Sequence, residues 1–149
     1  MKKEYFAFAI AGLIIFGYAL DSISGPVELA IRNPFLFLDS KIISIYPLTA
    51  VSIAAKTIAI VIAGPLILSL VQKQHILKSI VLFVIAGILV LYSIQQFATG
   101  LRITPVQWTL SFAFSGIGLL IPSASYLLLG LLKGTKKVLG DDSGEDFQL

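Results

Sequence analysis

Four long apolar runs divide the chain, and short polar segments separate them. A helix that spans a membrane needs about 20 mostly apolar residues, and each run is of roughly this length. The runs predict spans over residues 5–21, 46–71, 76–99 and 105–132. We therefore expect an all-α integral membrane protein, a four-transmembrane-helix bundle that forms one domain over residues 1–132.

The first apolar run, from Tyr5 to Leu20, has a second interpretation. A basic start, an apolar core and small residues such as Gly17 and Ala19 are also typical of a cleaved signal peptide. Because the apolar run continues almost to Asp21, we favour a first transmembrane helix over a signal peptide.

The segment over residues 24–44 mixes charged, apolar and helix-breaking residues. Pro26 follows a serine and a glycine, which favours a helix that begins there with proline in its first turn. Asn33-Pro34 predicts the end of that helix, because proline disfavours helical backbone in the residue before it. We expect a short interfacial amphipathic helix between spans 1 and 2. An ordinary loop with a few buried side chains is the alternative.

Small residues recur at helical spacing in the second and fourth runs. Ala55, Ala59 and Ala63 lie four residues apart, which places them on one face of a helix. Gly116 lies in the first half of the fourth span, which is rich in glycine and serine. Small side chains let another helix approach closely, so we expect these four positions to serve helix packing.

The composition supports a membrane protein and narrows the possible functions. Hydrophobic residues make up 57% of the chain and charged residues 13%, whereas soluble domains carry about 25% charged residues. The net charge of +3 does not indicate nucleic acid, because the basic residues flank the apolar runs rather than form one patch. The chain has no cysteine, which excludes disulfides, thiolate metal sites and cysteine nucleophiles.

The distribution of lysine and arginine predicts the orientation. If the N-terminus is cytoplasmic, seven basic residues fall in cytoplasmic segments and three in external segments, as the positive-inside rule requires. Four spans bring both ends to the same side. We expect both termini in the cytoplasm and the protein in the cytoplasmic membrane.

The C-terminal residues 133–149 are first basic and then acidic. Lys133, Lys136 and Lys137 directly follow the last span, and we expect them to contact anionic lipid. The segment has too few apolar residues to fold alone, so we expect a disordered tail.

One lysine, Lys56, lies inside the second apolar run. A charged side chain at the centre of a membrane helix costs about 2.5–3.5 kcal/mol on insertion scales, so it needs water or a partner. Its ammonium can reach the surface by extending the stem, or it can bond to a neighbouring span. The alternative is that Lys56 faces the bundle interior and binds or moves an anionic solute.

Several polar residues fall in the same leaflet as Lys56 in the expected topology. Asp21 ends the first span, two glutamines end the third, and another glutamine begins the fourth. Because an unpaired charge in the membrane is costly, we expect Asp21 or Glu28 to pair with Lys56. The candidate intramembrane polar cluster comprises Lys56, Asp21, Glu28, Gln95, Gln96 and Gln107.

The sequence contains no recognisable catalytic, cofactor or metal signature. His75 is the only histidine and lies in a polar turn, whereas a metal site usually needs three or four ligands. Paired carboxylates are absent from the apolar runs, and a phosphate-binding glycine loop is absent from the chain. We therefore expect no enzyme activity, no cofactor and no metal.

Two functions remain. We expect a structural or accessory subunit of a membrane complex, whose partners are the lipid bilayer and either other membrane-protein subunits or a second copy. The small size and the packable faces of spans two and four favour this interpretation. The alternative is a small oligomeric transporter or channel for an anionic or polar solute, which would use Lys56 and nearby glutamines.

Overall fold

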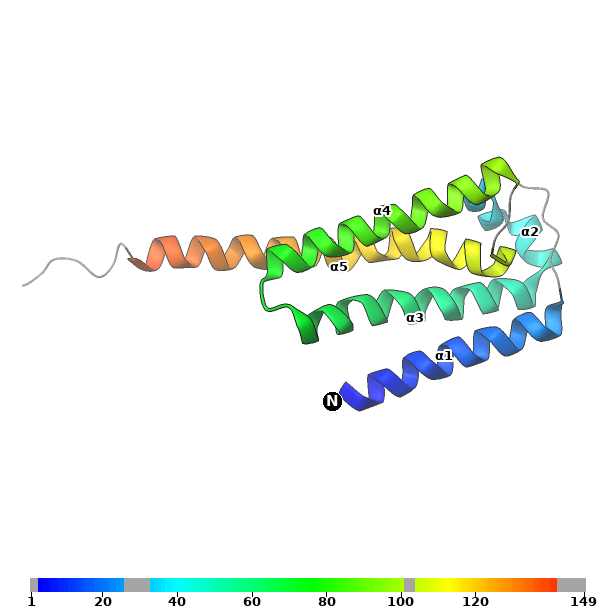
Figure 1. Cartoon of the computed structure of the whole chain (residues 1–149), viewed down its shortest axis with the longest axis horizontal. Helices are drawn as coiled ribbons and strands as arrows, with labels where there is room; N and C mark the ends of the chain where they lie inside the picture. Colours follow the sequence, from blue (N-terminus) through cyan, green and yellow to red (C-terminus); the bar gives the residue numbers. More distant parts are fainter. Residues whose placement is uncertain (1–2, 26–32, 101–103, 142–149) are drawn as a thin grey trace, which may run out of the picture.

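The computed structural model describes the backbone of residues 3–25, 33–100 and 104–141, with side chains over 5–25, 33–100 and 104–134. Throughout these residues the fold is all-α, and four helices are long and apolar enough to cross a membrane. They are α1 (Lys3–Ser24), α3 (Pro47–Val71), α4 (His75–Thr99) and α5 (Val106–Asp141) (Figure 1). The expected four-helix membrane bundle is confirmed.

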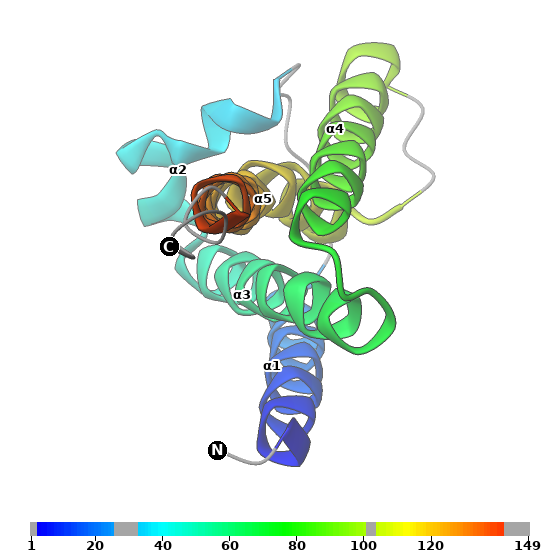
Figure 2. The same ribbon diagram turned by 90° about the vertical axis from the view of Figure 1, so that its left-hand side faces the viewer.

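The long helices pack in the spatial order α1, α3, α5, α4. The most extensive contact joins α4 to α5, while α3 packs against α5 and α1 packs against α3. Figure 2 looks along the bundle and shows α1 on the outer side of α3, away from α4. α1 is therefore an edge helix with one main neighbour.

The bundle has two ends, which we name by their residues (Figure 1). At the Asp21 end, α1 and α4 finish and α3 and α5 begin. At the His75 end, a short turn joins α3 to α4. Gly100 closes α4 with a left-handed φ of 68°, a conformation that glycine adopts without steric cost.

The described part of the link between α1 and α3 holds two short helices, η1 (Pro34–Leu38) and α2 (Ser40–Ile45). A short helix begins at Pro34, and Asn33 before it has extended backbone, with φ −127° and ψ 123°, as expected for a residue that precedes proline. The Asn33 side chain accepts a hydrogen bond from the Phe35 N–H at 3.0 Å. Asparagine is a favoured N-cap and proline fits the first turn, so this pair starts a helix. The helix expected from Pro26 falls on residues 26–32, outside the described ranges.

Phe37 anchors this link to the Asp21 end of the bundle. Its side chain is 2% exposed and packs in a cluster with residues of three long helices, which are Ile53, Phe97, Val106 and Leu110. Figure 1 shows α2 lying across that end. Over residues 33–46, the described part of the link is therefore neither a plain loop nor one continuous helix, because its two short helices lie across the bundle end and Phe37 is buried there.

α5 is longer than its apolar part. We expected a disordered tail from residue 133, but the helix continues to Asp141. Adding a residue to an existing helix gains one backbone hydrogen bond, so extension is easier than nucleation. The glycines in this stretch each weaken the helix by about 1 kcal/mol without ending it. The remainder of the expected tail, residues 142–149, lies outside the described residues.

Small residues allow α4 and α5 to approach closely. A Cβ added at Gly116 would lie 2.6 Å from the Val90 Cγ2 and 2.7 Å from the Ala86 carbonyl oxygen. On α3, Ala55 and Ala59 are buried while Ala63 is half-buried. Gly116 therefore lies at a contact between helices, where a small residue keeps the backbones close.

Candidate functional site

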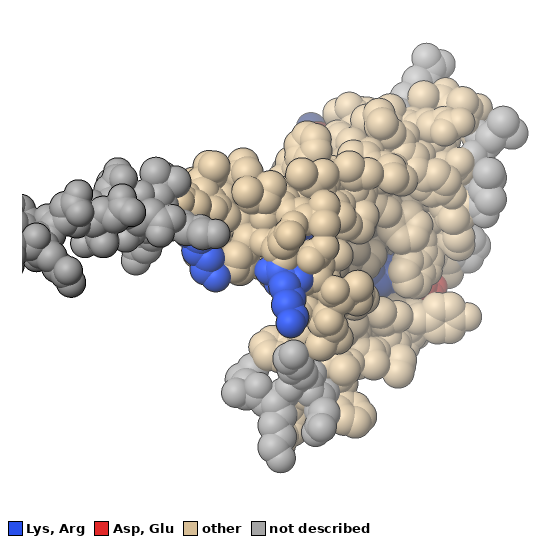
Figure 3. All heavy atoms as spheres, turned by 60° about the vertical axis from the view of Figure 1, so that its left-hand side comes forward, with Lys and Arg blue, Asp and Glu red and all other residues tan. Residues whose placement is uncertain are grey.

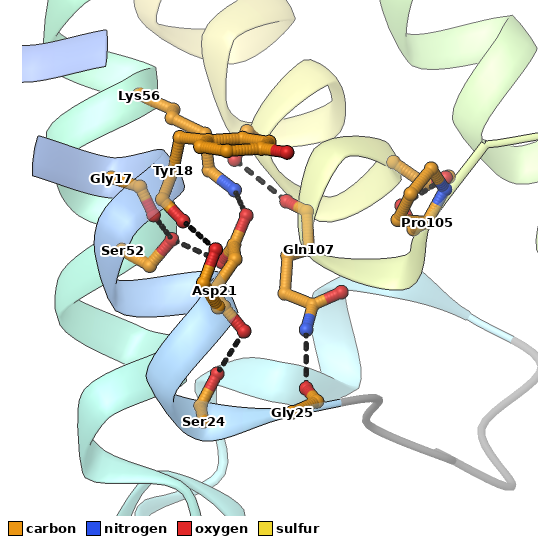
Figure 4. A network of polar contacts seen from close by, with 12 residues as sticks. Gly17, Tyr18, Asp21, Ser24, Gly25, Ser52, Lys56, Pro105 and Gln107 are labelled. Atoms are coloured by element: carbon orange, nitrogen blue, oxygen red, sulfur yellow. Dashed lines mark hydrogen bonds and ion pairs between the residues drawn. The ribbon is translucent and has the colours of Figure 1, made fainter. Parts of the chain in front are cut away.

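Lys56 is completely buried in the first half of α3. Its ammonium donates a hydrogen bond to the Asp21 Oδ2 at 2.5 Å and forms an ion pair with it (Figure 4). The Asp21 side chain is 15% exposed, and the Lys56 side chain is 0% exposed. Lys56 therefore does not snorkel to the surface. Its charge is balanced by the last turn of the neighbouring helix, α1, as the cost of an unpaired charge leads one to expect.

The second carboxylate oxygen of Asp21 is also engaged. The buried Ser52 hydroxyl lies 2.5 Å from the Asp21 Oδ1 and 2.9 Å from the Gly17 carbonyl oxygen. One hydroxyl carries one proton, so the two acceptors share it. Both oxygens of the carboxylate thus have partners on α3, which satisfies a charged group away from bulk water.

Gly17 makes room for this arrangement. A Cβ at Gly17 would lie 2.8 Å from the Lys56 Cγ and 3.2 Å from the Ser52 carbonyl oxygen. Any larger residue would displace either the lysine stem or the α3 backbone. Gly17 is thus a point of close approach between α1 and α3.

α5 closes the third side of the site. The Lys56 ammonium lies 4.7 Å from the centroid of the Trp108 ring, a distance at which the π-face attracts a cation. The Gln107 side-chain amide donates to the Gly25 carbonyl oxygen at 3.2 Å (Figure 4). α5 therefore contacts both the buried lysine and the end of α1.

The candidate cluster is only partly assembled. Asp21 and Lys56 form its centre, and Gln107 lies at its rim on the end of α1. Gln95 is exposed, so the expectation that it joins a buried cluster is wrong. Gln96 is buried in α4, and because consecutive helical residues point about 100° apart, the two glutamines cannot face the same way. Glu28 lies outside the described residues.

Sequence reasoning missed three members of the site, and two of them carried a signal. Ser52 lies four residues before Lys56, and Gly17 lies four residues before Asp21. Residues four apart share one face of a helix. The face of α3 that carries Lys56 therefore also carries Ser52, and the face of α1 that carries Asp21 also carries Gly17, which predicts both as neighbours of the charged pair. Trp108 directly follows Gln107 in the sequence and carried no comparable signal.

A hollow of about 360 Å³ opens beside Asp21, between the end of α1 and the start of α5. Asp21 is the one charged residue in its lining, and Lys56 lies behind it. The lining residues are Tyr18, Asp21, Ser22, Gly25, Pro105, Gln107 and Trp108. The hollow therefore presents a carboxylate, an amide and an indole to a molecule that enters.

The other sequence candidates lie at the His75 end. The Lys133 ammonium is 2.8 Å from the His75 Nε2. Lys136 and Lys137 lie in the C-terminal part of α5, beyond the described side chains. Across the described residues, no group of three or more His, Asp or Glu side chains has an arrangement that could hold a metal ion.

Comparisons with known proteins return nothing: no family model, curated protein or solved structure matches the chain.

Proposed function

We propose that the protein is a non-catalytic membrane protein that serves as a structural or accessory subunit of a membrane complex. The observation that carries this proposal is the state of Lys56, whose ammonium is paired with Asp21 and closed to solvent. A group that binds a solute needs a free face in a cavity. Lys56 has its charge balanced within the chain, which favours a role in holding helices together.

The pair fixes the position of α1 on α3. A buried ion pair often adds little net stability, because desolvation offsets the attraction, but a broken pair is costly. The contact therefore selects one arrangement of α1 over others. Apart from its contact with α3, α1 is largely apolar and exposed, so it is the helix with most surface left for lipid or for a partner.

We also propose that the protein lies in the cytoplasmic membrane with both termini in the cytoplasm. The support is the count of basic residues on the two sides. Lys73, Lys78 and Lys133 all belong to the His75 end, while the fully buried Lys56 pairs at the opposite end.

The test is to purify tagged protein in a mild detergent, identify what accompanies it by mass spectrometry, and measure the native mass. We expect stoichiometric recovery with other membrane proteins. Two exposed isoleucines give a matched pair of variants: Ile15 on α1, 69% exposed, and Ile121 on α5, 73% exposed. Ile15→Trp should release the partner if α1 carries the contact, and Ile121→Trp should retain it. Recovery of the protein alone would contradict the proposal.

A second candidate function rests on the hollow beside Asp21. A hollow whose lining includes an amide and a carboxylate paired with a buried lysine suits a transporter or channel for a polar solute. An anionic solute, the other possibility, would need Lys56 to leave Asp21, because Asp21 is the charge that the lining presents. Solute flux into liposomes tests it, with Lys56→Met as the variant and Lys41→Met, an exposed lysine at the same end, as the control. Flux that is lost only with Lys56→Met would favour transport over the structural role.

A further inference from the structure

A cationic cluster surrounds Tyr126 at the His75 end, far from the Asp21 pair. The Lys78 ammonium lies 5.2 Å from the centroid of the Tyr126 ring. The His75 ring stacks on Tyr126 with 6.0 Å between centroids. The Lys133 ammonium is 2.8 Å from the His75 Nε2. We call these four residues the Tyr126 cluster, and they join the first turn of α4 to the last apolar turns of α5.

The cluster has donors without matching acceptors. An ammonium group can only donate, so the Lys133 contact requires the His75 Nε2 to accept. We infer that the neutral ring then carries its proton on Nδ1. Nδ1 is buried and has no hydrogen-bond partner among the described residues. Lys78 is 7% exposed, and its one described side-chain contact is the ring face of Tyr126.

The described side chains supply no counter-charge here. Asp21 and Asp39 are the only acidic residues whose side chains the structure describes, and both belong to the opposite end. Figure 3 shows blue lysine atoms on the face where α5 leaves the bundle. Lys78, which is buried, and Lys133, which is exposed, both lie near His75. Like charges around one ring repel each other, and an anion would relieve that repulsion.

The same tyrosine borders an apolar hollow. A hollow of about 270 Å³ lies between α1, α3 and α5, and its lining is Phe6, Ile62, Pro65, Leu66, Ser69 and Tyr126. Tyr126 thus stands between a cationic cluster and a space with apolar walls. Lys133 directly follows the apolar run of α5, and Lys78 lies in the first turn of α4. This is the level at which lipid headgroups meet a transmembrane helix.

We propose that the Tyr126 cluster binds the phosphate of an anionic phospholipid, with one acyl chain of that lipid in the hollow beside it. Lys78 and Lys133 supply the two ammonium groups that neutralise the phosphate. His75 holds Lys133 in place and is a positioning residue. Charge complementarity selects the headgroup, and the apolar lining selects a lipid over a soluble phosphate.

Native mass spectrometry of the purified protein with added lipid tests the proposal. The probes are phosphatidylglycerol and phosphatidylcholine with the same acyl chains, because both carry a phosphodiester, but the choline ammonium of phosphatidylcholine cancels its charge and the glycerol of phosphatidylglycerol does not. We expect preferential retention of phosphatidylglycerol by the wild-type protein. Lys78→Gln with Lys133→Gln should reduce that retention by about tenfold or more, since each lysine near an anionic surface contributes about fivefold.

Two controls separate the site from general surface charge and from misfolding. Lys73→Gln removes an exposed lysine of the same end and should leave the retention nearly unchanged. The double arginine variant, Lys78→Arg with Lys133→Arg, keeps both charges and should retain phosphatidylglycerol as the wild-type protein does. Helix content measured by circular dichroism shows whether each variant is folded.

Three outcomes would overturn the proposal. The first is equal retention of the two lipids by the wild-type protein. The second is wild-type retention of phosphatidylglycerol by the folded double glutamine variant. The third is binding of inorganic phosphate with the same dependence on the two lysines but without retention of phosphatidylglycerol, which would assign the site to a free phosphate.

Discussion

The pair between Asp21 and Lys56 makes a strong prediction about which single substitution is most damaging. Asp21→Asn keeps the shape and the bond to Ser52 but removes the charge, so Lys56 stays buried and unpaired. Removing one partner of a buried ion pair costs about 3–5 kcal/mol, and a central membrane lysine costs about 2.5–3.5 kcal/mol. Because Asp21 is 15% exposed, some water can reach the site, and we expect a loss of about 3 kcal/mol.

Substitution of the other partner, Lys56, should reduce the free energy of unfolding by less. Lys56→Met keeps the apolar stem and removes the ammonium, and the remaining carboxylate still has Ser52 and the hollow beside it. We expect about 1–2 kcal/mol for Lys56→Met, since the Asp21 carboxylate can regain water. The double variant removes both charges and should cost no more than about 2 kcal/mol, because an apolar pair can replace a buried ion pair.

The assay is equilibrium unfolding in mixed detergent micelles, arranged as a double-mutant cycle. The chain has one tryptophan, and Trp108 lies 4.7 Å from the Lys56 ammonium, so its fluorescence reports on the site. Circular dichroism provides the second signal. Asp39→Asn is the matched control, because Asp39 is an exposed acid of the same end that caps α2. Asparagine caps a helix about as well as aspartate, so this variant should cost little.

The coupling energy between Asp21 and Lys56 tests whether each charge depends on the other for its stability in the buried site. Hydrogen-bonded pairs between membrane helices average about 0.6 kcal/mol in such cycles. We expect about 2–3 kcal/mol for this pair, because the single aspartate variant leaves a charge without a partner. A coupling energy near 0.6 kcal/mol, with Asp21→Asn no worse than Asp39→Asn, would refute the reasoning.

Three further substitutions test the packing. Gly116→Ala should destabilise the protein by about 1–3 kcal/mol, because its Cβ would meet the α4 backbone; Gly87→Ala, with open space around it, should be neutral or stabilising, and equal unfolding free energies would contradict this. Gly17→Ala should cost about 1–2 kcal/mol in the same unfolding assay, since the methyl group displaces the Lys56 stem. Phe37→Ala should cost about 3 kcal/mol because a buried aromatic is lost. Leu36→Ala, at an exposed neighbour, should cost well under 1 kcal/mol, and a similar loss for both would exclude Phe37 as the anchor.

Much of the architecture could be predicted from the sequence because few backbone structures are stable inside a membrane. A backbone in hydrocarbon must satisfy its own hydrogen bonds, so long apolar runs become helices. The same cost argument applied to Lys56 gave Asp21 as one of two possible partners. Both inferences depend on free-energy penalties that are larger than the free-energy differences between alternative ways of packing the helices.

The finer arrangement could not be predicted, and particular residues show why. All four spans are apolar on most sides, so hydropathy does not say that α1 lies at the edge or that α5 lies between α3 and α4. Gln95 and Gln96 are equivalent in sequence, and only the rotation of α4 decides that Gln96 is buried. Phe37 is one of several apolar residues in the link, and its role depends on the space left by three other helices.

The position of Asp21 on α1 also has a consequence for how the protein is made. A chain emerges from the ribosome N-terminal end first, so the aspartate reaches the membrane before the lysine that it neutralises. Until both helices are present, either one alone carries a charge without its partner. The ion pair therefore makes the stable insertion of α1 and of α3 depend on each other.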